Sequence, residues 1–160
     1  SFILVHWAGI KITTFYGLFG IHDLGIVASY LLSIFTIVVV TNSFNLIDGV
    51  DGLAASVGIL ASSVLGFWFY SAGVTQYSIL ASCMTGALVG FLYYNRSPAK
   101  IFMGDTGSLI VGVILSILAI KFIEMNRVLD RFHPNKVLAV PVVTLAILVI
   151  PLFDTLRVFT

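Results

Sequence analysis

The sequence predicts an all-α integral membrane protein, a polytopic bundle with about five transmembrane helices in a single membrane domain over residues 1–160. Composition is the first reason: 59% of the residues are hydrophobic and only 9% are charged, against roughly 45–50% and about 25% in globular proteins. A mean hydropathy of +1.12 is the second. These values exclude a soluble enzyme and a disordered tail, and a net charge of +1 gives no footprint for nucleic acid.

Five stretches of about 20 apolar residues are long enough, as helices, to cross a bilayer core of about 30 Å. In chain order the predicted spans are residues 24–44, 53–72, 77–94, 107–123 and 137–153. The fifth contains Pro141 and Pro151, which a membrane helix tolerates when its neighbours satisfy the backbone. Before the first span, residues 11–23 alternate in polarity and then contain Gly17 and Gly20, which predicts a short hairpin at the membrane face.

Two of the predicted spans carry a small residue at every fourth position, which lets helix backbones approach closely in lipid. One stripe comprises Ala54, Gly58, Ser62 and Gly66, and the other comprises Ser78, Ser82, Gly86 and Gly90. We therefore expect a compact bundle in which both stripes form helix contacts.

Counting membrane crossings assigns the charged residues to two faces. The end of the first span, the loop between the third and fourth spans and the end of the fifth share one face, here called the motif face. Its charged residues are Asp48, Asp51, Asp105, Asp154, Arg96, Lys100 and Arg157. The opposite face, here called the hairpin face, carries Lys11, Asp23, Lys121, Glu124, Arg127, Asp130, Arg131 and Lys136. With five basic residues, the hairpin face is the one that the positive-inside rule places in the cytoplasm.

Polar residues recur at a spacing of three in the first cluster, NSFNLIDGVDG at 42–52. Asn42, Asn45 and Asp48 can share one face of a helix, and Gly49 permits the break that Asp51 requires. A polar helix end with a glycine turn is the simpler interpretation. Two carboxylates and two amides at a lipid boundary nevertheless cost several kcal/mol unless they are paired or used.

The second cluster, NRSPAKIFMGDTGS at 95–108, is the longest polar loop on the motif face. Asp105 there could simply cap the following helix. Alternatively, the free N–H groups of that helix favour an anionic phosphate, and Asp105 could hold Mg²⁺ together with substrate phosphates. The motif face has no His, and its carboxylates, amides and cations together suit metal-assisted phosphoryl chemistry.

Both clusters resemble a known family. NSFNLIDGVDGLAA at 42–55 and PAKIFMGDTGSL at 98–109, in this order, are similar to the polyprenyl-phosphate N-acetylhexosamine-1-phosphate transferases (glycosyl transferase family 4), as is PLFDTLR at 151–157. Ile47 and the Lys100-Ile101 pair look closer to the branch that transfers GlcNAc-1-phosphate to undecaprenyl phosphate. The phospho-MurNAc-pentapeptide branch, which usually has Thr in place of Ile47, is the alternative.

The resemblance implies an Mg²⁺-dependent enzyme, with Mn²⁺ as a substitute, that transfers GlcNAc-1-phosphate from a UDP-sugar to undecaprenyl phosphate and releases UMP. Such lipid-linked sugars serve cell-wall or surface-polysaccharide synthesis, including lipopolysaccharide and O-antigen. Carried over by position, Asp105 is the metal ligand and acts with Asp48 and Asp51 in catalysis. The residues expected to bind substrate are Asn42, Asn45, Gly49, Val50, Asn95, Lys100 and Phe102, of which Phe102 stacks on uracil.

The resemblance further implies a bacterial inner-membrane protein whose motif face is cytoplasmic and whose short hairpin is extracytoplasmic, contrary to the positive-inside count. Its partners would be the two substrates and the bilayer, without nucleic acid, and a homodimer is left open. The family's adjacent Asp pair and His-rich loop are missing from this sequence, so we expect part of a longer enzyme that is inactive alone. A transporter or a non-catalytic bundle is the competing class, but a transporter should place charges within its spans, and Asp48, Asp51 and Asp105 lie at span ends.

Overall fold

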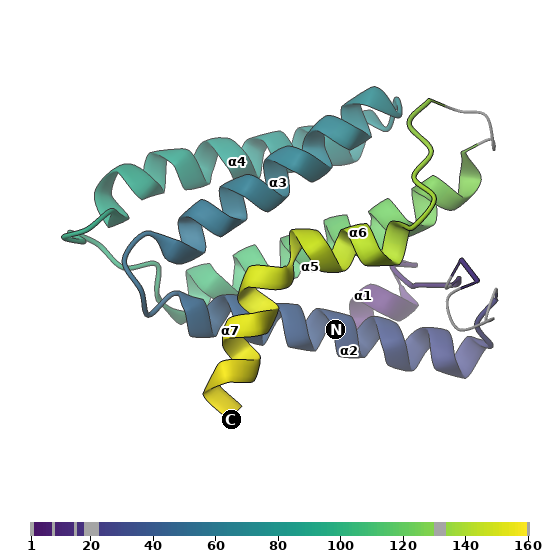
Figure 1. The fold of residues 1–160 in the computed structure, drawn as a ribbon, viewed down its shortest axis with the longest axis horizontal. Helices are drawn as coiled ribbons and strands as arrows, with labels where there is room; N and C mark the ends of the chain where they lie inside the picture. The colour runs from purple at the N-terminus through teal and green to yellow at the C-terminus, as the bar shows by residue number, and fades with distance from the viewer. Residues whose placement is uncertain (1, 8, 15, 18–22, 130–133, 160) are drawn as a thin grey trace.

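The computed structural model describes residues 2–7, 9–14, 16–17, 23–129 and 134–159, without the side chains of residues 4 and 155–159. Figure 1 shows an all-helical arrangement, and no strand occurs in these residues. The helices are α1 (Phe2–His6), α2 (Ile26–Ile47), α3 (Leu53–Ser71), α4 (Thr75–Asn95), α5 (Gly104–Val128), α6 (Val140–Ile147) and α7 (Val149–Phe159). Among them, α2, α3, α4 and α5 are long and apolar enough to span a membrane. The predicted polytopic membrane bundle is confirmed.

The fifth predicted span, residues 137–153, is wrong as a single helix. It is divided into α6 and α7, which meet at Leu148, so the described chain has four full-length spans. Pro141 lies in the first turn of α6, where a proline is tolerated. Pro151 is the physical reason for the break, because its ring would clash with the carbonyl of Ile147 in a continuous helix. In Figure 1, α7 turns away from the line of α6 and passes α2.

Two helix pairs form the bundle: α2 lies beside α5, and α3 lies beside α4. Close approach depends on glycine. A Cβ on Gly112 of α5 would lie only 2.6 Å from Cα of Thr41 on α2, and a Cβ on Gly66 of α3 would lie 3.0 Å from Cβ of Ala81 on α4. The largest side chains that are fully buried between the helices include Phe44, Phe69, Phe122, Leu65 and Leu115.

Only one of the two small-residue stripes forms a helix contact along its length. Ala54, Gly58, Ser62 and Gly66 are all buried on α3. On α4, by contrast, Ser82, Gly86 and Gly90 are exposed, and a Cβ on Gly86 or Gly90 would meet nothing within 4 Å. The helix instead buries Ser78, Ala81, Met84 and Leu88. This prediction was wrong for the second stripe because α4 packs on α3 through its Ala81–Met84–Leu88 side, which leaves Ser82, Gly86 and Gly90 on the exposed side.

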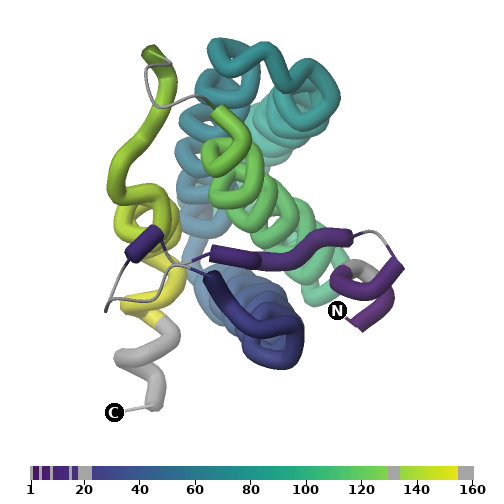
Figure 2. The backbone as a smooth tube through the Cα atoms, turned by 90° about the vertical axis from the view of Figure 1, so that its right-hand side faces the viewer, coloured from purple at the N-terminus to yellow at the C-terminus, as the bar shows by residue number. Residues whose placement is uncertain are grey.

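The segment before α2 folds back on itself as predicted. Thr14 and Asp23 form an antiparallel bridge, and the N–H of Leu24 donates to the carbonyl of Thr13 at 2.9 Å. Figure 2 looks onto this hairpin face and shows the N-terminal segment crossing in front of the helices. Gly20, Asp130 and Arg131, which were placed on this face, lie outside the described residues.

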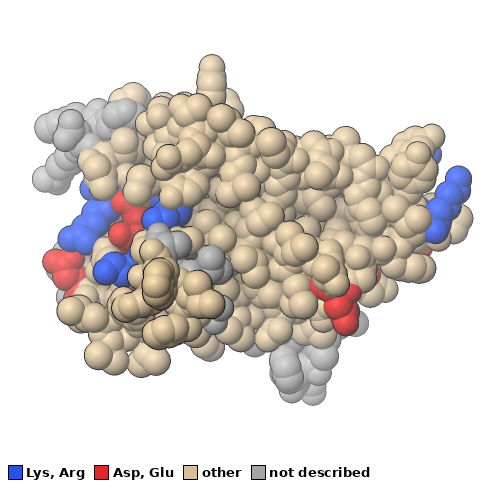
Figure 3. Space-filling view, turned by 180° about the vertical axis from the view of Figure 1, so that it is seen from behind, with Lys and Arg blue, Asp and Glu red and all other residues tan. Residues whose placement is uncertain are grey.

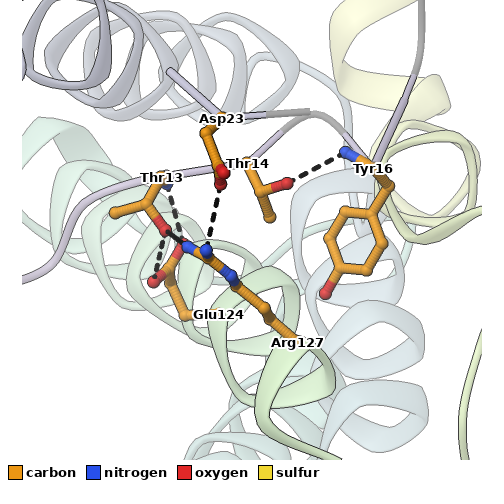
Figure 4. Close-up of polar contacts among 6 residues, drawn as sticks. All are labelled: Thr13, Thr14, Tyr16, Asp23, Glu124 and Arg127. Carbon is orange, nitrogen blue, oxygen red and sulfur yellow. Dashed lines mark hydrogen bonds and ion pairs between the residues drawn. The ribbon is translucent and has the colours of Figure 1, made fainter. Parts of the chain in front are cut away.

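A charged network fastens the hairpin to the end of α5 (Figure 4). The N–H and Oγ1 of Thr13 donate to Oε1 of Glu124 at 2.8 and 2.9 Å. The guanidinium of Arg127 lies between them and Asp23, donating to Oγ1 of Thr13 at 2.8 Å and to Oδ1 of Asp23 at 3.0 Å. These interactions join segments more than 100 residues apart in the chain.

The predicted grouping of the end of the first span with the loop between the third and fourth spans is confirmed, whereas the side chains of Asp130, Arg131 and Arg157 lie outside the described residues. The end of α2, the start of α3 and the loop between α4 and α5 lie together at one end of the bundle, opposite the hairpin (Figure 1). In the space-filling view of Figure 3, blue and red side chains gather toward the ends, and the broad middle is almost entirely tan. An apolar belt between two polar ends is the surface expected of a membrane-spanning bundle.

Candidate active site

The motif face brings together three segments that are distant in sequence. They are the turn that follows α2, the loop that joins α4 to α5, and the first turn of α5. Because α2 and α5 lie side by side, polar residues at the end of α2 reach those at the start of α5. The spacing of three along residues 42–51 and the crossing count together predicted this meeting.

Asp105 lies where the end of α2 meets the beginning of α5. The side-chain amide of Asn45 donates through Nδ2 to Oδ1 of Asp105 at 3.1 Å and to Oγ of Ser108 at 3.0 Å. Ser108 is fully buried, and its hydroxyl also lies 3.1 Å from the carbonyl oxygens of Gly104 and Asp105. Asn45 is therefore held in one orientation, with its amide nitrogen directed at the carboxylate.

The interpretation of Asp105 as a helix cap is not what the structure shows. Helix α5 begins at Gly104, its N-cap position is Met103, and no side chain caps it through a hydrogen bond. Asp105 is instead inside the first turn, where the partial positive charge of the helix end favours a negative group. Its carboxylate is exposed and is available to a ligand.

Asp48 reaches the same place from the other helix. It follows the last residue of α2, and its Oδ2 accepts a hydrogen bond from the N–H of Gly104 at 3.1 Å. Partial burial raises the pKa of the Asp48 carboxyl, and the negative charge of Asp105 raises this pKa further, while the Gly104 hydrogen bond opposes the rise. A carboxyl group whose pKa is raised by burial and by a neighbouring carboxylate is a common feature of functional sites.

Asp51 and Asn95 organise the neighbouring loop. Oδ2 of Asp51 accepts from the N–H of Ala99 at 3.1 Å. Asn95 is 2% exposed; its Oδ1 accepts from the N–H of Gly52 at 3.0 Å, and its Nδ2 donates to the carbonyl of Ile101 at 2.9 Å. Asn95 thus ties the turn after α2 to the loop before α5. The nucleoside contact expected of it stays a prediction.

The remaining predicted residues surround this centre without joining its hydrogen bonds. Phe102 is 68% exposed and Val50 is 56% exposed, and Gly49, Lys100 and Asn42 are also exposed. Within the described residues, no hydrogen bond links Asn42 to Asn45 or Asp48. Asp154 is half-buried on α7, and the side chain of Arg157 lies outside the described residues.

Two residues that matter to the geometry were missed in the sequence. Ser108 lies three residues after Asp105 and so projects from the same side of α5. Gly112 lies one turn further on and allows α5 to approach Thr41, one turn before Asn45 on α2. Ser108 follows Asp105 by three residues and Gly112 follows Ser108 by four, and this helical spacing could have placed both on the side of α5 that carries Asp105.

The donor set limits which metal this chain could hold. In the described residues, no three His, Cys, Asp or Glu side chains gather into a metal site. The chain offers the carboxylates of Asp105 and Asp48, joined through Gly104 and Asn45. Mg²⁺ is commonly bound by one or two carboxylates together with substrate phosphates and water. These two carboxylates therefore fit Mg²⁺ better than they fit a metal that takes all of its ligands from the protein.

Sequence comparison places this geometry in a family. The family described as glycosyl transferase family 4 matches residues 1–123, which include both motif clusters and the whole Asn45–Asp48–Asp105 centre. The chain belongs to glycosyl transferase family 4. The family resemblance drawn from residues 42–55 and 98–109 is therefore confirmed.

Curated relatives of this glycosyl transferase family 4 chain come from both expected branches. A Bacillus subtilis protein described as a probable undecaprenyl-phosphate N-acetylglucosaminyl 1-phosphate transferase is 39% identical over 127 residues, covering 79% of this chain and 33% of the relative. Phospho-N-acetylmuramoyl-pentapeptide-transferases are 43% identical over 100 residues in Chlamydia muridarum (61% and 30% covered) and 49% over 92 residues in Rubrobacter xylanophilus (56% and 27%). The chain spans about a third of the length of these relatives.

Proposed function

We propose that the full-length gene product transfers GlcNAc-1-phosphate from a UDP-sugar to undecaprenyl phosphate and releases UMP. An oxygen of the lipid phosphate forms a bond to the sugar-linked phosphorus, and the bond from that phosphorus to UMP breaks. One observation supports this most strongly. Two carboxylates without a cationic partner among the described residues, Asp48 and Asp105, meet at the N-terminus of α5.

Asp105 and Asp48 would hold Mg²⁺, with Mn²⁺ as a substitute, against the diphosphate of the sugar nucleotide. The bound ion would neutralise charge on the phosphates during transfer. Asn45 orients the Asp105 carboxylate through its Nδ2, and Ser108 holds the Asn45 amide in place. The free N–H groups of the first turn of α5 add a positive potential toward the phosphates.

The nucleoside would bind beside this centre, against the exposed side chains of Phe102 and Val50. A planar aromatic ring exposed at the edge of a polar site suits stacking with a base such as uracil. Gly49, Asp51 and Asn42 border the same region, and Asn95 keeps the turn and the loop in register. Lys100 supplies a positive charge on the same loop.

An apolar cavity of about 260 Å³ suits the tail of the lipid substrate. It lies between α2, α5, α6 and α7, and its wall is formed almost wholly by aliphatic and aromatic side chains. Leu32, Phe35, Val39, Ile123, Leu145 and Leu148 are among them. The break at Leu148 turns α7 toward α2, which helps to close the cavity. A polyprenyl chain would gain roughly 25 cal/mol for each Å² of apolar surface removed from water.

The motif face would be cytoplasmic, because this orientation gives the site access to UDP-sugars made in the cytoplasm. The inner bacterial membrane is the corresponding location. Tagging the loop at residues 97–99 and testing accessibility to a membrane-impermeant reagent in intact cells measures this directly. Labelling of intact cells without permeabilisation would show that the orientation is the one favoured by the positive-inside count.

The decisive experiment measures UMP release by membranes that contain the full-length gene product, UDP-GlcNAc, undecaprenyl phosphate and Mg²⁺. We expect turnover by the wild type and a loss of about 100-fold or more in Asp105→Asn. Asp23→Asn is the matched control, since it neutralises an exposed carboxylate on the hairpin face. Normal turnover in Asp105→Asn would remove that residue from the mechanism.

The second candidate is phospho-MurNAc-pentapeptide transfer, which the Chlamydia and Rubrobacter relatives favour. The same membranes supplied with UDP-MurNAc-pentapeptide separate the two. Release of UMP with this donor and not with UDP-GlcNAc would assign the chain to that branch, while the roles of Asp48 and Asp105 would be unchanged.

A further inference from the structure

A polar hollow lies on the motif face at the end of α4, and neither Asp48 nor Asp105 lines it. Its volume is about 360 Å³. It is formed by the last turn of α4 and the bend that follows, through Tyr93, Tyr94, Arg96, Ser97, Pro98 and Lys100. Because α4 packs chiefly on α3, the other side of α4 is exposed in the described chain, and the hollow lies at the motif-face end of that side.

The hollow is positively charged. Arg96 and Lys100 are both exposed, and neither forms an ion pair with a carboxylate of the described residues, where Arg127 pairs with Asp23. The N–H of Lys100 donates to the carbonyl of Tyr94 at 2.9 Å, which folds the bend back toward α4. The neighbouring carboxylate, Asp51, accepts from the N–H of Ala99 at 3.1 Å and so lies along the backbone side of the bend.

The aromatic wall matches the depth of lipid headgroups. Tyr93 and Tyr94 are 65% and 51% exposed, and their rings meet edge to face at 5.0 Å. The guanidinium of Arg96 lies over the Tyr93 ring at 5.4 Å. Tyrosine is enriched at the boundary between hydrocarbon and water, and arginine or lysine beside it attracts anionic lipid phosphates.

We propose that this hollow binds the phosphate group of an anionic membrane lipid. Arg96 and Lys100 contact the phosphate oxygens, and Tyr93 and Tyr94 contact the part of the lipid between phosphate and tails. A free phosphate would satisfy the same cations but would leave the aromatic wall unused. Binding here does not require turnover at Asp48 and Asp105, so it can be tested separately from the proposed transferase activity.

The test counts lipids that stay bound to the full chain, by native mass spectrometry, after purification with equal amounts of phosphatidylglycerol and phosphatidylcholine. We expect the wild type to retain phosphatidylglycerol preferentially. The double variant Arg96→Gln/Lys100→Gln should lose about tenfold or more of that preference, since each basic residue near a membrane surface contributes about 1 kcal/mol. The matched control, Lys11→Gln/Lys121→Gln, makes the same change in charge on the hairpin face and should keep the wild-type preference.

Three outcomes would overturn the proposal: the double variant keeps its phosphatidylglycerol, the control loses it equally, or inorganic phosphate displaces the lipid as well as added lipid does. The last result would assign the hollow to free phosphate. Displacement by undecaprenyl phosphate but not by inorganic phosphate supports a lipid-phosphate site and adds the acceptor to its ligands. Arg96→Lys/Lys100→Arg preserves charge at exposed positions and should retain binding, which separates loss of charge from loss of folding.

Discussion

The two ends of the bundle carry similar kinds of charged residue but neutralise them differently. On the hairpin face, Glu124 accepts hydrogen bonds from Thr13, and Arg127 joins Thr13 to Asp23 (Figure 4). On the motif face, Asp48 and Asp51 each accept one backbone hydrogen bond, and Asp105 accepts one from an amide. None of these three carboxylates pairs with a cation in the described residues.

This difference separates a structural site on the hairpin face from the proposed functional site on the motif face. Charge that is already matched within the chain, as at Glu124 and Arg127, fastens the hairpin and leaves little for a ligand. Unmatched carboxylates at a lipid boundary cost free energy, and substrate phosphates with a metal ion would repay that cost. Helix α5 shows both behaviours: Lys136 donates to the carbonyls of Asn126 and Leu129 at its C-terminal end, whereas its N-terminal end holds Asp105.

The largest expected effect comes from removing one unmatched charge. Asp48→Asn should lower UMP release by the full-length gene product by about 100-fold or more, the scale of losing one transition-state electrostatic contact. Folding should survive, because the Asn carbonyl oxygen can still accept from the N–H of Gly104. UMP assays and thermal melting of the same preparation measure both quantities. A variant that melts far below the wild type would assign Asp48 to the structural class instead.

Closing the gap between α2 and α5 should affect stability and activity together. A Cβ at Gly112 would lie 2.6 Å from Cα of Thr41 and 3.3 Å from its carbonyl oxygen, so Gly112→Ala must push the helices apart. Overpacking of this kind costs about 1–3 kcal/mol, and it should also lengthen the contact between Asn45 and Asp105. Gly86→Ala is the control, since a Cβ there meets nothing within 4 Å. Equal melting temperatures for the two variants would contradict the role of Gly112.

On the hairpin face, a substitution is expected to change stability but not activity. Glu124→Gln replaces a charged acceptor of the Thr13 hydrogen bonds with an amide, and should lower the free energy of unfolding by about 1–2 kcal/mol. Limited proteolysis within residues 9–24 should become faster, and the UMP release rate should stay near that of the wild type. Asp23→Asn, which breaks an exposed ion pair, should have a smaller effect on stability. A large loss of activity in Glu124→Gln would contradict the assignment of a structural role to the hairpin face and a catalytic role to the motif face.

Helix positions and the meeting of motif residues could be predicted, because both depend on patterns along the chain. Apolar length located α2, α3, α4 and α5 to within a few residues, and crossing parity brought Asn45 and Asp48 to the side of Asp105. Which face of each helix packs could not be predicted. Helix α4 is apolar around most of its circumference, so its Ser82–Gly86–Gly90 stripe looked as suitable for contact as the Ala81–Met84–Leu88 side that is buried.

Features that depend on partner shape were also beyond the sequence pattern. Pro151 accounts for the break at Leu148, but the direction in which α7 then runs depends on its packing against α2, which the sequence does not show. The family resemblance implied a substrate contact for Asn95, and the structure shows in addition that both groups of its amide form hydrogen bonds within the chain. These two hydrogen bonds depend on how close Gly52 and Ile101 lie to Asn95 in space, which the sequence pattern does not show.

The smallest expected effect is a pH dependence of stability that arises at Asp48. Because burial and Asp105 raise the pKa of Asp48 above its ordinary value of 3.8, the folded chain holds the Asp48 proton more tightly than the unfolded chain does. Ionisation of Asp48 therefore costs folding stability as the pH rises through its folded-state pKa. In detergent-purified protein at neutral pH, Asp48→Asn should have a slightly higher free energy of unfolding than the wild type, and so a slightly higher melting temperature. The difference in free energy should be less than about 1 kcal/mol, because solvent screens a partly exposed carboxylate. The difference in stability between the two proteins should disappear as the pH falls toward 3.8.

Added Mg²⁺ should reduce the same difference in stability at neutral pH, since a cation that binds the ionised pair stabilises the wild type more than the variant. A gap that widens at low pH would show that Asp48 is stabilised as a carboxylate, and the two faces would then neutralise their charges in the same way.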